Sequence, residues 1–285
     1  MPAPSRHFAC TQCGKCCDRA PEVELGEAAA LADVFIWQLL FRLYSLPRSV
    51  ADFPAEGAPR KQAAAQFFES RELLDTFAAH TSHAKAMVDG KPQQRTFYLT
   101  ISALAFDPLG AGCPALSGPL CSIHPRRPLT CRSVPLHYSR GLSLAAEELD
   151  RFTATPGFAC ATGAEAPLVL EGGKVADPHI AAARADAAAQ AERDGPWKAA
   201  LVKAMKLGDP RVPSLAQVEQ AAARGALTAS MNGAWEIAIE VGLVAADLVE
   251  DLKRHQHAAL DRMSASPEMT LAAAQAIAEQ RRLLA

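Results

Sequence analysis

The 285-residue chain lacks the charge excess and the signature motifs of several large protein classes. Its 29 Lys and Arg side chains nearly balance its 31 Asp and Glu side chains, giving a net charge of -2. A nucleic-acid-binding protein would normally carry a basic excess, so we expect no nucleic-acid partner. The sequence contains no Gly-rich dinucleotide fingerprint, Walker loop, HExxH or GxSxG element. It therefore gives no motif-based indication of nucleotide binding, metalloprotease activity or serine-hydrolase activity.

Segments that would direct the chain to a membrane are also missing. The first residues, MPAPSRHF, have no apolar core typical of a secretion signal. The most apolar early stretch, residues 31–46, is short and interrupted by Asp33, Gln38 and Arg42, so it should not span a bilayer. We therefore expect a cytoplasmic protein without membrane association, in a compartment where thiols stay reduced.

The hydrophobic pattern predicts a mainly α fold with a small β component and metal-braced irregular loops in the N-terminal half. The usage of 49% hydrophobic and 21% charged residues is globular. A strand is predicted over 95–101, a hairpin over 168–177 and a loop over 110–135. Helices are predicted over 24–45, 60–88, 144–152, 178–193, 196–207, 214–224, 233–259 and 267–284.

No cysteine follows Cys160, and this shift in composition predicts where the chain divides. We expect a cysteine-cluster metal-binding domain over residues 1–163 and a helical C-terminal region over 164–285. The second region is either separate or packed on the first as one unit.

Four cysteines fall in the segment CTQCGKCC: Cys10, Cys13, Cys16 and Cys17. Two-residue spacing lets sulfurs face one point, and Gly14 can adopt positive φ, so this segment predicts a metal-binding knuckle. Cys16 and Cys17 are adjacent, and adjacent side chains point apart in an extended chain. Both can bind one metal only if the backbone turns there; otherwise Cys17 lies outside the ligand set, serves a second metal or is reactive. Buried structural cysteines or a disulfide are the competing interpretations, and a reducing compartment argues against the disulfide.

The second cluster comprises Cys113, Cys121 and Cys131, whose wider spacing is a weaker signal. The prolines around these cysteines restrict the backbone, which lowers the entropy lost in holding three sulfurs together. Arg127 and Arg132 either form ordinary surface ion pairs or orient a ligand carboxylate or phosphate. His124 and His137 rank below the cysteines as ligands. Cys160 is either an eighth thiolate or a buried structural cysteine, and the structural interpretation is favoured because no motif surrounds it.

Together the two clusters resemble the YkgJ-type CxxCxxCC cysteine-cluster family of zinc- or iron-chelating proteins. The resemblance covers about the first half of the chain and departs from the family pattern at His124 and Val134. The matching positions are Phe8, Cys10, Cys13, Gly14, Cys16, Cys17, Cys113, Pro114, Leu116, Cys121, Ile123, Arg127, Pro128, Cys131, Arg132 and Pro135.

This resemblance implies metal chelation as the function, and three hypotheses follow. The first is a protein that binds zinc, iron or an iron–sulfur cluster through two cysteine clusters that meet in space. The second is a metal-dependent lysine N-methyltransferase using S-adenosylmethionine, because the family includes flagellin lysine N-methylases. The third is an adaptor that is folded by metal and binds a protein partner through its C-terminal helices. All-sulfur sites suit both zinc and iron–sulfur clusters, so the metal stays open.

Overall fold

The computed structural model describes residues 5–17, 20–53, 60–110 and 112–284, and the chain forms two compact units. Packing defines these units, whereas the predicted division after residue 163 was drawn from cysteine content alone. Unit 1 consists of Met1–Cys16, Tyr44–Tyr98 and Leu116–Ala189. Unit 2 consists of Cys17–Leu43, Leu99–Ala115 and Gln190–Ala285.

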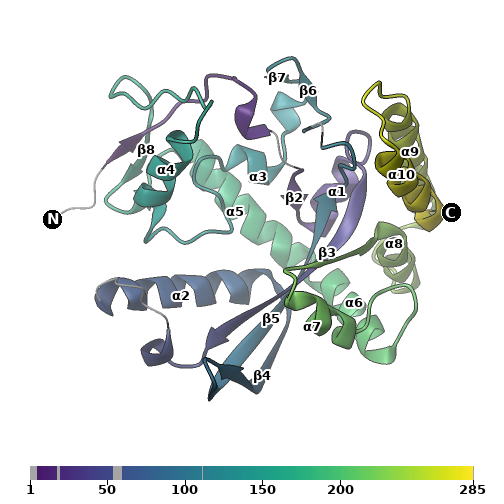
Figure 1. Cartoon of the computed structure of the whole chain (residues 1–285), viewed down its shortest axis with the longest axis horizontal. Coiled ribbons are helices and arrows are strands. Elements are labelled where there is room, and N and C mark those ends of the chain that lie inside the picture. Colours follow the sequence, from purple (N-terminus) through teal and green to yellow (C-terminus); the bar gives the residue numbers. More distant parts are fainter. Residues whose placement is uncertain (1–4, 18–19, 54–59, 111, 285) are drawn as a thin grey trace. The chain divides into compact units, whose positions relative to one another are not determined.

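The prediction of a mainly α fold with a small β component is wrong. Helices account for 46% of the structure and strands for 21%, with several sheets including a curled half-barrel, so this is an α/β fold (Figure 1). Two predicted helices end early and continue as strands. Residues 24–45 form α1 (Leu25–Ala30) and then β3 (Trp37–Pro47), and residues 60–88 form α2 (Arg60–Phe77) and then β4 (Ala78–Val88).

Pairing with a neighbouring strand explains why β4 is not helical. Asp89 and Gly90 have φ angles of 49° and 75°, and this left-handed pair turns the chain directly into β5 (Lys91–Ala105). Two consecutive positive φ values are the mark of the tight turn that favours a β-hairpin. The alanines of β4 would favour a helix, but the hairpin pairs them with β5, whose β-branched and aromatic side chains favour a sheet.

The largest sheet has the strand order β10-β3-β5-β2, and β4 also pairs with β5. The edge strands are β2 (Glu22–Val23) and β10 (Leu227–Ser230). Both are antiparallel to their partners, with Glu22 opposite Leu104 in β5 and Leu227 opposite Phe41 in β3. Both long strands, β3 and β5, contribute residues to each unit.

Unit 1 contains a second sheet, in which β1 (Arg6–His7), β8 (Leu168–Glu171) and β9 (Lys174–Val175) lie in the order β1-β8-β9. The predicted hairpin over 168–177 is confirmed by β8 and β9. The helices of this part are α3 (Leu129–Arg132), α4 (Ala145–Thr153) and α5 (Pro178–Arg193). Their hydrophobic core is formed by Phe8, Leu136, Ala145, Leu149, Val169, Leu170 and Ile180.

Most of the described part of unit 2 near the C-terminus is helical. The helices of this part are α6 (Gly195–Leu207), α7 (Leu215–Ala222), α8 (Met231–Glu240), α9 (Ala246–Ser264) and α10 (Leu271–Leu284). Helices α9 and α10 pack side by side (Figure 1). The helix predicted over 233–259 is broken at Gly242, which has a φ of 72°. The last helix begins at Leu271 rather than at 267, because Thr270 caps it by accepting a bond from the Ala273 amide at 3.1 Å.

One buried glutamine joins α9 to the chain around β3. Gln256 is fully buried, and its Oε1 accepts a hydrogen bond from the Trp37 amide at 2.7 Å. Its Nε2 donates to the carbonyls of Ala32 at 3.0 Å and Phe35 at 2.7 Å. A helix side chain thereby satisfies three backbone groups at the point where the chain enters the strand.

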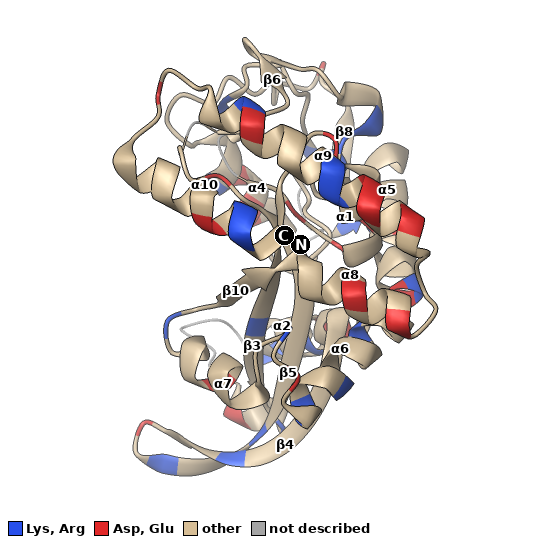
Figure 2. Ribbon diagram, turned by 90° about the vertical axis from the view of Figure 1, so that its right-hand side faces the viewer, with Lys and Arg blue, Asp and Glu red and all other residues tan. Residues whose placement is uncertain are grey.

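Charges of both signs occur along the exposed faces of α9 and α10 (Figure 2). Several are paired, as in the contact between Arg281 and Asp261 at 2.6 Å. Within the part of the chain that the structure describes, no helix combines the length and apolar character needed to cross a membrane.

Candidate metal centre

The first cysteine loop is shaped by two left-handed residues and by amides directed at sulfur. Gln12 and Gly14 have φ angles of 60° and 72°, so the chain turns back on itself after Cys10. The Gln12 amide donates to the Cys10 sulfur at 3.4 Å. Hydrogen bonds from backbone amides stabilise a thiolate, the form of cysteine that binds metal. The loop then enters a short 3-10 turn, Lys15–Cys17.

The surroundings of Cys13 also favour the thiolate form over the thiol. Hydrogen bonding from the backbone of Ala159, and then from the backbone of Lys15, lowers the pKa of the Cys13 thiol below its ordinary value. The Ala159 contact shows that the segment before Cys160 lies against the first loop. The residue that lowers the pKa of Cys13 most is therefore almost 150 positions away in the sequence.

Gly14 brings the two cysteine loops together within unit 1. A Cβ atom at this position would lie 3.3 Å from the Cα of Pro119 and 3.4 Å from its carbonyl oxygen. Both this close approach and the positive φ favour glycine. Pro119 lies between Cys113 and Cys121, so the second cysteine segment passes directly over the first loop.

Cys17 and Cys113 are neighbours in unit 2. The Cys113 amide donates to the Cys17 carbonyl at 3.0 Å. The backbones of the two cysteine segments therefore touch at this point. Convergence of their sulfurs on one metal stays a prediction.

The remaining cysteines of the second cluster lie on short elements of unit 1. Cys121 ends β7 (Leu120–Cys121), which pairs with β6 (Leu116–Ser117), and Cys131 lies in α3. Pro125 lies at the start of a 3-10 turn, His124–Arg126, and Pro128 caps α3. The prolines therefore start local turns, as expected of residues that restrict the backbone.

The two arginines proposed as ligand-orienting groups have local partners. Arg132 is ion-paired with Asp186 at 3.7 Å, and Arg127 donates to the His124 carbonyl at 3.2 Å. The ring nitrogens of His137 contact the hydroxyls of Thr130 at 2.5 Å and Ser139 at 2.8 Å. These contacts give His137 a structural role in fixing the turn after α3.

Cys160 lies close enough to the first loop to be affected by its charges. Burial raises the pKa of the Cys160 thiol, and the negative charges of Cys13, Cys16 and Cys10 raise it further. The sequence offered no local motif to link this cysteine with the others. The signal lies in the pairing of residues near position 9 with residues near position 161, which only the fold reveals.

Thiol sulfurs are suitable ligands for a thiophilic metal, but in the structure they do not lie together around one point. All eight cysteines are thiols that form no disulfide. Within residues 5–17, 20–53, 60–110 and 112–284, no three Cys, His, Asp or Glu side chains are gathered in a group that could hold a metal. A metal would therefore have to draw the sulfurs together, as happens when metal binding is coupled to local folding.

A second site, which the sequence did not reveal, lies in unit 2 beside α6. Lys198 Nζ lies 2.6 Å from Glu24 Oε2, and the two side chains are 3% and 6% exposed. Burial raises the pKa of Glu24 to about 7, against the lowering effect of the Lys198 charge. Asp194 lies at the start of the same helix and accepts a hydrogen bond from the Gly26 amide at 2.9 Å.

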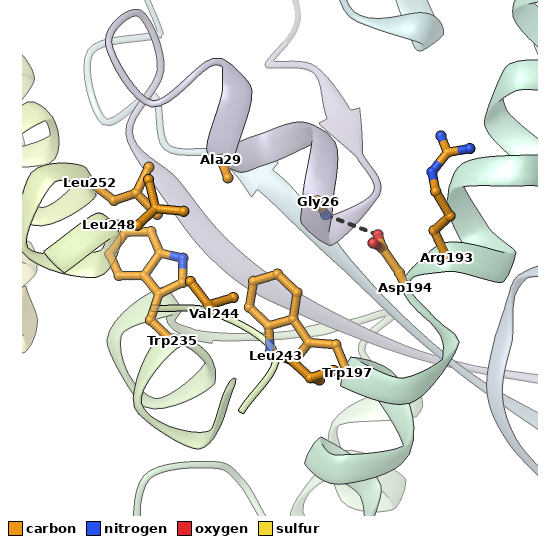
Figure 3. Close-up of a pocket in the computed structure, with 10 residues that line it drawn as sticks. All are labelled: Gly26, Ala29, Arg193, Asp194, Trp197, Trp235, Leu243, Val244, Leu248 and Leu252. Carbon is orange, nitrogen blue, oxygen red and sulfur yellow. Dashed lines mark hydrogen bonds between the residues drawn. The ribbon is translucent and has the colours of Figure 1, made fainter. Parts of the chain in front are cut away.

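A mostly apolar pocket of about 230 Å³ adjoins this group (Figure 3). The Trp197 indole donates to the Ala234 carbonyl at 2.9 Å. The Trp235 indole is 1% exposed, and its N–H finds no acceptor among the described residues. The lining is mainly apolar but also includes the charged side chains of Arg193 and Asp194. Such a pocket suits a small, mostly apolar molecule that carries a hydrogen-bond acceptor for the Trp235 indole. The walls include Trp197, Trp235, Leu243, Val244, Leu248 and Leu252.

Comparison of the chain with protein-family models, curated proteins and solved structures found no match. Any assignment of function therefore rests on the residues of the two cysteine segments.

Proposed function

We propose that this protein binds zinc or iron, as single ions or as an iron–sulfur cluster, through the thiolates of its cysteine segments. The observation that carries the proposal is the shape of the first loop. There, backbone amides donate to the sulfurs of Cys10 and Cys13, and left-handed residues turn the chain between them. Amide-to-sulfur bonds of this kind orient thiolates toward a shared metal.

The chemistry of the donors supports a thiophilic metal over a hard cation. Sulfur ligands select zinc, copper(I) and iron–sulfur clusters, whereas magnesium and calcium take oxygen ligands. The predicted ligands Cys10, Cys13, Cys16, Cys17, Cys113, Cys121 and Cys131 outnumber the four that one tetrahedral zinc needs. Seven cysteines could bind either one iron–sulfur cluster, with some thiols left over, or a pair of metal ions.

Metal affinity in matched variants tests the proposal. Protein purified without oxygen would be titrated with zinc against a chelating dye, and its visible spectrum after anaerobic iron loading would separate zinc binding from cluster binding. Replacing Cys13 with alanine should weaken binding more than about 100-fold, because loss of even an outer hydrogen-bonding partner typically costs about 10- to 100-fold.

The control is Ser117→Ala, an exposed change on the neighbouring hairpin that removes no thiol. It should bind like the unaltered chain. Equal affinities for Cys13→Ala and Ser117→Ala would refute a role for the first loop in metal binding.

A further inference from the structure

The segment around Cys160 pairs with the first cysteine loop in a fixed register. Ala9 and Ala161 form an antiparallel bridge, with the Ala9 amide 2.8 Å from the Ala161 carbonyl and the Ala161 amide 3.1 Å from the Ala9 carbonyl. Two residues that exchange both hydrogen bonds fix which residues come next along each strand. One step further, Cys10 stands opposite Cys160.

A contact at the following position confirms that this register continues. The Thr11 hydroxyl donates to the Ala159 carbonyl at 2.6 Å. Cys10 and Cys160 therefore lie between two points of attachment. In antiparallel strands, residues at such a position have side chains on the same face and Cα atoms about 4.5 Å apart.

Cys160 is anchored by the core as well as by this pairing. Its partly buried side chain packs against the hydrophobic cluster that includes Phe8 and Leu149. Phe8 in turn is tied to the same segment, because its amide donates to the Pro167 carbonyl at 2.9 Å. The thiol is thus anchored to the hydrophobic core of unit 1, whereas Cys10, Cys13 and Cys16 lie outside this core.

We infer that Cys160 supplies the fourth thiolate of a metal site whose other three sulfurs come from Cys10, Cys13 and Cys16. The inference rests on the proposed function and completes a tetrahedral set of four sulfurs, the usual arrangement for structural zinc. All four cysteines belong to unit 1. The ligand is a divalent thiophilic ion, and closure of the site requires the loop to fold toward the anchored Cys160.

The experiment counts sulfur ligands in protein loaded anaerobically with one equivalent of cobalt(II) or zinc. X-ray absorption on the zinc form should give four sulfurs for the unaltered chain and three for Cys160→Ala. The thiolate-to-cobalt charge-transfer band should lose about one quarter of its intensity, because one of four sulfurs is gone. Cys160→Ser serves as a second variant that keeps the size of the partly buried side chain.

Ser117→Ala is the control, since it is an exposed change in the same unit and removes no thiol. It should leave four sulfurs. Four sulfurs in both Cys160 variants would overturn the inference, as would a Cys10–Cys160 disulfide in protein isolated without oxygen. Failure of the unaltered chain to bind metal would instead refute the proposed function, so the two failures are distinguishable.

Discussion

Replacing Lys198 with methionine should destabilise unit 2 by about 1.4 kcal/mol more at pH 8 than at pH 5. The ammonium group of Lys198 lies 2.6 Å from the Glu24 carboxylate, and both side chains are almost fully buried. Burial raises the pKa of Glu24 to about 7, so this carboxyl is still mainly ionised at pH 8 while Lys198 is present. Removing the cation takes away the attraction that lowers the pKa of Glu24, so the folded variant keeps the Glu24 proton at pH 8. Keeping that proton one pH unit above a pKa of about 7 costs the variant about 1.4 kcal/mol that the paired group does not lose.

The direction of the pH dependence follows from the raised pKa of Glu24. The folded chain keeps the Glu24 proton up to about pH 7, whereas the unfolded chain loses it near the ordinary value of 4.5. The stability contributed by this group is therefore full below pH 4.5 and is lost as pH rises to about 7. At about 1.4 kcal/mol per pH unit, this interval corresponds to about 3 kcal/mol.

At pH 5 Glu24 is protonated in the folded chain, so Lys198→Met leaves no buried anion. The loss of stability should then stay within about 1 kcal/mol, the size of an ordinary hydrogen bond. A double variant, Glu24→Gln with Lys198→Met, should recover most of the extra loss at pH 8, because no carboxyl that must hold a proton is left in the folded chain.

Tryptophan fluorescence during urea unfolding is the assay. The three tryptophans, Trp37, Trp197 and Trp235, all belong to unit 2, so their signal reports its unfolding directly. Lys203→Met, an exposed change on the same helix, is the control and should stay within about 0.5 kcal/mol. Equal losses for Lys198→Met at pH 5 and pH 8, or a loss no larger than that of Lys203→Met, would refute the reasoning.

Three further predictions concern the fold and the first cysteine loop. Gln256→Leu leaves three buried backbone groups without partners, so the free energy of unfolding of unit 2 should fall by about 3 kcal/mol or more, while exposed His255→Leu on the same helix changes it little. Gly14→Ala should weaken metal binding about 10-fold in a dye competition, because a side chain at a φ of 72° costs about 1–2 kcal/mol. Gly90 has a similar φ of 75° but lies away from the cysteines, so Gly90→Ala should bind metal normally. Chelation of the metal should speed proteolysis within residues 10–17, because the metal joins their sulfurs; identical cleavage rates with and without metal would contradict this.

Local signals were sufficient to predict several elements of the fold. The Gly172–Gly173 turn identified the β8–β9 hairpin, and α5 has the predicted bounds of residues 178–193. Ser214 caps α7 through a capping box with Gln217, close to the predicted helix start. In each case the deciding contacts lie within a few residues of one another.

The errors arose where pairing with distant residues overrode local preference. Asp89 and Gly90 form a hairpin turn, but the alanines of β4 indicated a helix that Gly90 would end. A dipeptide of this kind between two candidate strands is a turn signal, so this error was avoidable.

The distant contacts in the candidate site had no comparable signal in the sequence. Cys160 meets the first cysteine loop only because Ala9 pairs with Ala161, and Glu24 meets Lys198 only through packing in unit 2. Contacts between residues so far apart leave no periodic pattern in a single sequence. The cysteine spacing could therefore predict a knuckle but not which sulfurs complete the site.

The metal content of protein expressed in medium containing both zinc and iron, and purified without oxygen, tests the central claim most directly. Elemental analysis against protein concentration should give at least one zinc or iron per chain, and this ratio should fall in a Cys10→Ala, Cys13→Ala, Cys16→Ala triple variant. Reduced, folded protein that carries neither metal, and that takes up neither zinc nor iron when they are added without oxygen, would contradict the account.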